Sequence, residues 1–205
     1  MKPVALIAVV ALLWVAAVAN ARAQDLVRPP HETDLAFAER VLHVDDDNDP
    51  HVVAAAWNGV PTLFVDYQTT TGEETNRPVV ALMRQPDGRF RLIHITVGEE
   101  EGGSADLAAI GFADADHSGA KALVTIISWE QNHHMLVSGT LYEVRIFAAP
   151  RPGQTDLVPL KLSSHFDGGC ECWHEDGPPK HPEYQTHYRF KTIAAIKREL
   201  HKMGY

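Results

Sequence analysis

The chain has 205 residues, of which 45% are hydrophobic, and a formal net charge of −9 at pH 7. This length and apolar content are sufficient for a packed core and exclude a chain that is disordered throughout. The negative charge disfavours nucleic acid and acidic membrane surfaces as partners, because the long-range field repels them, and it favours cations and basic proteins.

The N-terminal segment predicts export. Lys2 precedes an apolar run at 4–18 that is too short to act as a stop-transfer helix, and small residues around Ala21 then offer a cleavage site. We therefore expect a signal peptide at 1–23 and a single exported domain at 24–205. The mature protein is expected to be periplasmic or secreted, with no stable membrane insertion after cleavage.

The first elements predicted in chain order are a short helix and two β-hairpins. Thr33 or Asp34 is a suitable N-cap for a helix that extends to Leu42, although this segment is also compatible with a strand. Two β-rich runs, 52–57 and 60–67, flank Asn58-Gly59, a pair that favours a type I′ turn. A second hairpin is predicted to join 79–84 to 90–97 through Pro86-Asp87-Gly88.

The second half of the chain predicts further strands and a final helix. Strands are expected at 107–112, 122–129 and 135–147, an edge strand at 157–162 and an irregular loop at 163–186. Apolar residues at helical spacing over 191–203 predict an amphipathic helix that covers the sheet. The predicted fold class is α+β, mostly β: an antiparallel meander sheet of six to eight strands with a C-terminal amphipathic helix.

Two acidic loops share one spacing of oxygen-bearing side chains. Each loop precedes a strand that ends in tryptophan, and the alternating residues are Asp45, Asp47 and Asp49 in the first loop and Asp114, Asp116 and Ser118 in the second. Alternating oxygens before a sharp turn suit a calcium ion, which needs several oxygen ligands around it. The alternative is an Asx-rich turn whose carboxylates accept bonds from backbone N–H groups.

The segment 111–124, Gly-Phe-Ala-Asp-Ala-Asp-His-Ser-Gly-Ala-Lys-Ala-Leu-Val, resembles the FG-GAP or VCBS type of calcium-loop repeat found in extracellular β-propellers and adhesins, and 44–53 resembles a degraded copy. The resemblance implies that Asp114, Asp116 and Ser118 are calcium ligands. The sequence departs from the repeat pattern at Ala122, where an acidic residue is usual, and at Pro50, where the first loop would need glycine. Two copies cannot close a propeller, so the resemblance implies the loop and not the whole architecture.

A second candidate site lies in the segment before the last helix. Its sulfur and imidazole side chains are His165, Cys170, Cys172, His174, His181 and His187. Cys170, Cys172 and His174 could present three ligands to zinc or copper, although the spacing differs from that of common zinc sites. The alternative in an exported protein is a Cys170–Cys172 disulfide with surface histidines around it.

The tryptophans differ in their expected roles. Trp57 and Trp129 end strands and are expected to fill the core, whereas Trp173 lies in the predicted loop and is the better candidate for an exposed carbohydrate-binding surface.

No catalytic motif occurs in the sequence: there is no Gly-x-Ser-x-Gly, His-Glu-x-x-His or phosphate-binding glycine loop. The expected function is therefore binding, in which an exported protein recognises a protein partner, such as a basic one, in the manner of an inhibitor or immunity protein. The alternative function is a zinc- or copper-binding protein, or a metal-dependent hydrolase, that uses the Cys170, Cys172 and His174 cluster.

Overall fold

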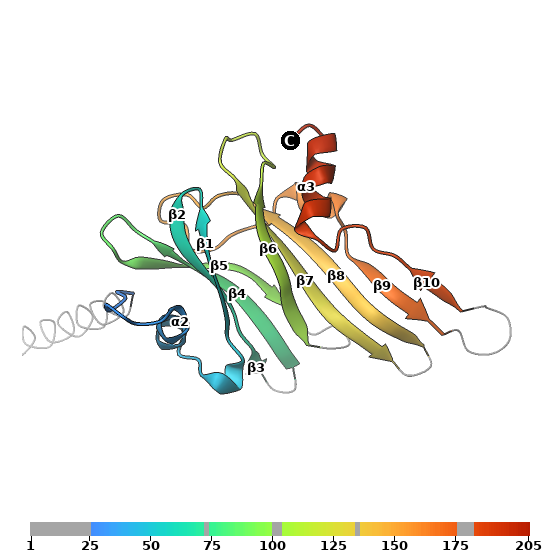
Figure 1. Ribbon diagram of the computed structural model, residues 1–205, viewed down its shortest axis with the longest axis horizontal. Helices are drawn as coiled ribbons and strands as arrows, with labels where there is room; N and C mark the ends of the chain where they lie inside the picture. The colour runs from blue at the N-terminus through green and yellow to red at the C-terminus, as the bar shows by residue number, and fades with distance from the viewer. Residues whose placement is uncertain (1–25, 72–73, 100–103, 134–135, 176–182) are drawn as a thin grey trace, which may run out of the picture.

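The computed structural model describes residues 26–71, 74–99, 104–133, 136–175 and 183–205, so the expected signal peptide at 1–23 lies outside the described residues. Figure 1 shows the arrangement of the elements. In chain order they are α2 (Asp34–Leu42), η1 (Asp46–Asn48), β1 (His51–Trp57), β2 (Val60–Asp66), β3 (Thr69–Thr71), β4 (Glu74–Arg84), β5 (Phe90–Gly98), β6 (Ala105–Ala113), β7 (Ala122–His133), β8 (Val137–Phe147), η2 (Lys161–His165), β9 (Gly169–His174), β10 (Tyr184–Thr186) and α3 (Ile193–Lys202). None of the described helices is long and apolar enough to cross a membrane.

The strands form two antiparallel sheets rather than one. The first sheet has the order β1-β2-β4-β5, with β3 paired to the start of β4, and the second is a meander with the order β6-β7-β8-β9-β10. The sequence therefore predicted the class correctly, mostly β with antiparallel pairing and a C-terminal helix. It missed the division after β5, because alternation of apolar residues identifies strands but does not tell which sheet a strand joins.

Four layers follow from the alternation of side chains along the strands. Phe37 and Ala38 of α2 pack on one face of the first sheet, against Leu63, Val65 and Leu82. The opposite face of that sheet packs against the second sheet through a core of Trp57, Phe64, Ile93, Leu123 and Phe147. The far face of the second sheet is covered at one end by α3 through Ile196 and Leu200. The order of layers is helix, sheet, sheet, helix.

The first helix and the first turn form for the reasons that the sequence suggested, and the last helix begins at a cap that it did not predict. The Thr33 hydroxyl accepts a hydrogen bond from Ala36 N at the start of α2, and the Thr192 hydroxyl accepts one from Ala195 N at the start of α3. Asn58 and Gly59 both adopt positive φ, at 51° and 81°, so that two residues join β1 to β2 as a type I′ turn requires.

Two predictions about the region before α3 are wrong. The expected edge strand at 157–162 is instead extended chain that leads into the short helix η2, and the expected irregular loop at 163–186 contains the strands β9 and β10. β9 pairs with the edge of β8, where Gly139 lies at φ 142°. A Cβ at Gly139 would lie 2.3 Å from Glu171 O, so a glycine in β8 is what allows β9 to approach.

The turn of the first hairpin also joins the two sheets. Trp57 Nε1 donates to Lys121 O at 2.7 Å, and Asn58 Nδ2 donates to the same carbonyl at 3.0 Å. In return, Lys121 N donates to Asn58 Oδ1 at 2.7 Å. Because Lys121 directly precedes β7, these bonds fix the position of the second sheet relative to the first.

Candidate functional site

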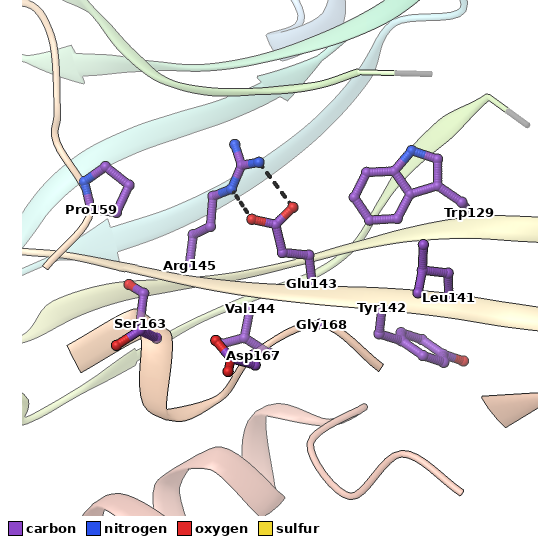
Figure 2. A pocket seen from close by; sticks show the side chains of 11 residues that line it. Trp129, Leu141, Tyr142, Glu143, Val144, Arg145, Pro159, Ser163, Asp167 and Gly168 are labelled. Carbon is purple, nitrogen blue, oxygen red and sulfur yellow. Dashed lines mark hydrogen bonds and ion pairs between the residues drawn. The ribbon is translucent and has the colours of Figure 1, made fainter. Parts of the chain in front are cut away.

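A pocket of about 440 Å³ lies along the edge of β8, beyond the point where β9 stops pairing with it. Figure 2 shows the side chains that line this β8-edge pocket. They are Trp129, Leu141, Tyr142, Glu143, Val144, Arg145, Pro159, Ser163, Ser164, Asp167 and Gly168. β7, β8 and the segment that contains η2 thus all contribute to one site.

The edge of β8 turns a backbone donor and acceptor toward this pocket. Ile146 accepts a bond from Leu160 N at 2.7 Å and donates to Ser163 Oγ at 2.9 Å, so its peptide groups point away from β7. Because this direction repeats every second residue in an antiparallel strand, Val144 N–H and C=O point the same way. Among the described strands, the pairing of β9 with β8 ends at Tyr142, one residue before Glu143.

An ion pair forms one wall of the pocket. Arg145 Nε lies 2.5 Å from Glu143 Oε1 and Arg145 Nη2 lies 2.9 Å from Glu143 Oε2, which makes the pair bidentate. Arg145 also donates to Thr96 Oγ1 and, at 3.1 Å, to Val97 O in the first sheet. The guanidinium therefore holds Glu143 in place and ties the pocket wall to the neighbouring sheet.

An apolar end and a polar end complete the pocket. Trp129 is buried and donates from Nε1 to Glu99 O at 2.6 Å, and Leu141 lies beside it on the same side of β8 (Figure 2). At the other end Ser164 and Asp167 are exposed polar residues of the lining. The three charged groups of the lining are two carboxylates and one guanidinium, so the pocket carries a net negative charge.

The segment that carries Asp167 is held from the far side by Tyr188. The Tyr188 hydroxyl donates to Phe166 O and, at 2.7 Å, to Asp167 O. Burial, together with the negative charges of Asp167 and Glu143, raises the pKa of Tyr188 to about 12, so the hydroxyl keeps the proton that it donates. Tyr188 in turn stacks on Tyr142, with ring centroids 5.9 Å apart.

The second acidic loop, the predicted calcium site, is satisfied by groups of the chain itself. Asp114 Oδ2 lies 2.5 Å from Lys121 Nζ, and Asp116 Oδ1 accepts a bond from Ser118 N at 3.0 Å. Hydrogen bonds from Ser118 lower the pKa of Asp116, and Ser118 Oγ accepts from Ala120 N. This is the geometry of an Asx turn; calcium binding at Asp114, Asp116 and Ser118 stays a prediction.

The first acidic loop is organised by a buried arginine. Arg77, 2% exposed, donates from Nη2 to Asp49 O and to Asp49 Oδ2, both at 3.1 Å, and from Nε to the buried Asp66 at 2.5 Å. Burial by itself lowers the pKa of Arg77, but hydrogen bonds and charge from Asp66 and Asp49 raise it, so the guanidinium stays charged. Of the three alternating aspartates in this loop, Arg77 contacts Asp49, whereas Asp45 accepts a bond from Asp47 N within the loop.

The described cysteine and histidine side chains of the second candidate site make separate contacts in the structure. Cys170 and Cys172 are paired with each other as a disulfide, and His174 stacks on Tyr184 with ring centroids 4.4 Å apart. His165 lies 3.4 Å from Glu199 and His187 lies 2.9 Å from Glu171, while His181 is outside the described residues. The described part of the chain contains no group of three His, Cys, Asp or Glu side chains arranged to hold a metal.

Trp57 and Trp129 lie in the core as the sequence predicted, whereas Trp173 lies in strand β9 and not in a loop. Trp57 and Trp129 are buried, with exposed fractions of 1% and 2%, and both ring N–H groups have backbone acceptors. Trp173 is 40% exposed on the face of β9 opposite the disulfide, which leaves its proposed role in ligand contact open to test.

Sequence reasoning missed the β8-edge pocket. The signal available was a charged pair, Glu143 and Arg145, at alternate positions in a predicted strand. Asp167 gave no such signal, because its place beside β8 depends on η2 and β9, neither of which was predicted.

Comparison of the chain with protein-family models, with curated proteins and with solved structures found no match. The pocket, the acidic loops and the disulfide are therefore interpreted from their own geometry.

Proposed function

We propose that this chain is an exported binding protein that recognises a basic protein partner, in the manner of an inhibitor or immunity protein, through the β8-edge pocket. The observation that carries the proposal is the unpaired stretch of β8 at Val144, flanked by an apolar wall and by carboxylates. An extended segment of a partner can bond to such an edge through its main chain, and side-chain pockets beside the edge then supply specificity.

The charges of the pocket favour a cationic anchor. Asp167 and Glu143 outnumber Arg145, and the whole chain carries a net charge of −9. The aliphatic stem of a lysine or arginine whose charge is directed to Asp167 would lie against Tyr142 and Val144, on the face of β8 opposite Leu141 and Trp129 (Figure 2). The long-range field of the chain would also accelerate encounter with a basic protein.

Synthetic peptides test this proposal directly. Ten-residue extended peptides that differ only in a central Arg, Lys or Glu are titrated against the protein by calorimetry at low and high salt. We expect the Arg and Lys peptides to bind, more weakly at high salt, and the Glu peptide to fail. Equal binding of all three peptides, or of none, would contradict recognition of a basic segment at this pocket.

A pair of charge variants locates the binding surface. Asp167→Asn should weaken binding of the Arg peptide by about 2- to 5-fold, the range expected for a partly exposed ion pair. Asp87→Asn, in the exposed turn between β4 and β5, removes the same charge far from the pocket and serves as the control. If both variants lower affinity equally, the effect is one of net charge and the pocket is not the site.

Export is the part of the proposal that depends on the N-terminal segment. We expect the chain to be recovered from the periplasm or the medium with its N-terminus near residue 22 or 24. An unprocessed chain that is folded in the cytosol would contradict this.

A zinc- or copper-binding protein, or a metal-dependent hydrolase, is the second candidate function. Its support is that Cys170, Cys172 and His174 alternate along β9 and so face the same side of the strand. Thiolate ligands require the reduced protein. Metal analysis of tag-free, reduced protein tests it: stoichiometric zinc or copper that is lost in Cys170→Ser and His174→Ala would support this function.

A further inference from the structure

We propose that the Cys170–Cys172 pair is a site of thiol–disulfide exchange, at which an external thiol reacts with Cys170 and Cys172 leaves. The argument rests on the place of the two cysteines in the fold, and it is independent of the proposed partner recognition.

The disulfide has little to contribute to stability. It closes a loop with one intervening residue, Glu171, and the loop-closure entropy that a crosslink removes from the unfolded chain falls as the loop shortens. Both cysteines also belong to β9, whose pairing with β8 already fixes their backbone. The bond therefore joins no two elements that would otherwise separate, and its loss should leave the sheet intact.

The two cysteines differ in their exposure to solvent. Cys172 is 1% exposed and lies opposite Gly139 of β8, where an added Cβ would come within 3.1 Å of Cys172 Sγ. Cys170 is half-buried and lies opposite Leu141, a residue that lines the β8-edge pocket. An incoming thiol can therefore reach Cys170, whereas Cys172 is enclosed by its own sheet. A pair with one accessible and one enclosed sulfur has a defined direction of attack.

The residue between the cysteines does not oppose the reaction. Glu171 alternates with them and points to the opposite face of β9, where it contacts His187 at 2.9 Å and Lys191 at 2.9 Å. A thiolate approaching Cys170 thus meets no carboxylate from this residue on its own face of the strand, and so avoids the repulsion that two negative charges at close range would cause.

The chemistry is a two-step exchange with a dithiol substrate. The first substrate thiolate attacks Cys170 Sγ, the Cys170–Cys172 bond breaks, and a mixed disulfide forms while Cys172 leaves as a thiolate and takes up a proton. The second substrate thiolate attacks the substrate sulfur of the mixed disulfide, and Cys170 leaves and is protonated. The substrate dithiol is oxidised to a disulfide, and the protein is reduced to the dithiol by the same two electrons and two protons.

Two single-cysteine variants test the direction of attack. Cys172→Ser and Cys170→Ser are incubated with oxidised glutathione and followed by mass spectrometry. We expect Cys172→Ser to form the glutathione mixed disulfide at least about tenfold faster, since its remaining thiol is the accessible one. In urea the two rates should converge, which checks that both thiols are chemically competent, and thermal melting checks that both variants fold.

The native chain tests the exchange itself. The oxidised protein is mixed with a reduced peptide that contains two cysteines, and the masses of both are recorded under native conditions. A gain of two hydrogens by the protein and a loss of two by the peptide is expected. Equal trapping rates for the two folded variants, or a protein disulfide that persists in excess dithiol, would overturn the proposal.

Discussion

Arg77 holds the end of the first acidic loop at Asp49 and neutralises the buried Asp66 beneath it. Its guanidinium contacts Asp66 and Asp49, and His51 Nδ1 lies 2.8 Å from Arg77 Nη2. Asp66 and Arg77 are both nearly inaccessible to water, so neither charge can be solvated if the other is removed. A buried ion pair of this kind carries a desolvation cost, and removing one partner costs more, because the other charge is left buried and uncompensated.

Replacing Arg77 with leucine should therefore destabilise the protein severely. Asp66 would remain buried without its partner, and we expect a loss of about 3–5 kcal/mol in the free energy of unfolding, measured by urea denaturation. Adding Asp66→Leu should restore part of this loss, because the buried charge is then gone as well. Arg84→Leu, an exposed position at the end of β4, is the control and should change stability by less than about 0.5 kcal/mol.

The lowered pKa of Glu171 predicts that its contribution to the stability of the fold is lost in acid. Hydrogen bonds from His187, then Lys191 and Tyr188 N, lower its pKa from 4.5 to about 2 in the folded chain. Since the folded pKa lies below the unfolded one, the stabilisation is complete above the unfolded value and is lost as the pH falls from 4.5 through about 2. The difference in melting temperature between the native chain and Glu171→Gln should thus narrow over this interval. Glu175→Gln, exposed just after β9, should show no such narrowing.

At the scale of elements, local signals in the sequence were sufficient wherever a segment could form with its own residues. The cap of α2 and the turn at Asn58-Gly59 depend on side chains within a few positions, and both formed as predicted; the cap of α3 at Thr192 is equally local but was not predicted. β9 and β10 were missed because they need the edge of β8, which lies more than twenty residues earlier in the chain.

The N-cap of α3 gives a prediction at this scale. Thr192→Ala removes the acceptor for Ala195 N, and we expect a loss of about 1 kcal/mol, or about 2–4 °C in melting temperature. Thr192→Ser keeps a hydroxyl acceptor and should stay close to the native value. Equal losses in the two variants would show that the methyl group, and not the cap, is responsible.

The calcium prediction concerns the loop that precedes β7. Binding at Asp114, Asp116 and Ser118 should raise the melting temperature at millimolar calcium by mass action. The rise should be larger in Lys121→Met, because the ammonium group that contacts Asp114 competes with the ion. Magnesium at the same concentration is the control, since it fits such loops poorly. No shift with calcium in either chain would contradict the prediction.

At the scale of the whole molecule, the two sheets share one core. Trp57, Phe64 and Ile93 of the first sheet pack with Leu123 and Phe147 of the second, and the bonds between Asn58 and Lys121 lie at the edge of that core. Neither sheet can expose this interface to water without losing the burial of large apolar side chains. The sheets should therefore unfold together.

Fluorescence of single tryptophans tests this cooperativity. Trp57 reports on the first sheet and Trp129 on the second. The chain also contains Trp14 and Trp173, so both are replaced with phenylalanine, and adding Trp129→Phe or Trp57→Phe then leaves one tryptophan as the probe. Circular dichroism gives the stability cost of each substitution. Within each variant, fluorescence and circular dichroism should give the same urea midpoint. Midpoints that differ between the probes would show that the sheets unfold separately.

The sequence by itself determined the β-rich class, the first hairpins, the C-terminal helix and the burial of Trp57 and Trp129, because each follows from the periodicity of side chains or from residues close together in the chain. It left the segment of α2 open between helix and strand. Only the tertiary structure decided that the strands form two sheets, that Arg77 joins Asp49 of the first loop to the buried Asp66, and that Glu143, Arg145 and Asp167 line one pocket. These features depend on contacts between residues that are distant in the sequence, and such contacts are set by the packing of whole layers, on which local patterns carry no information.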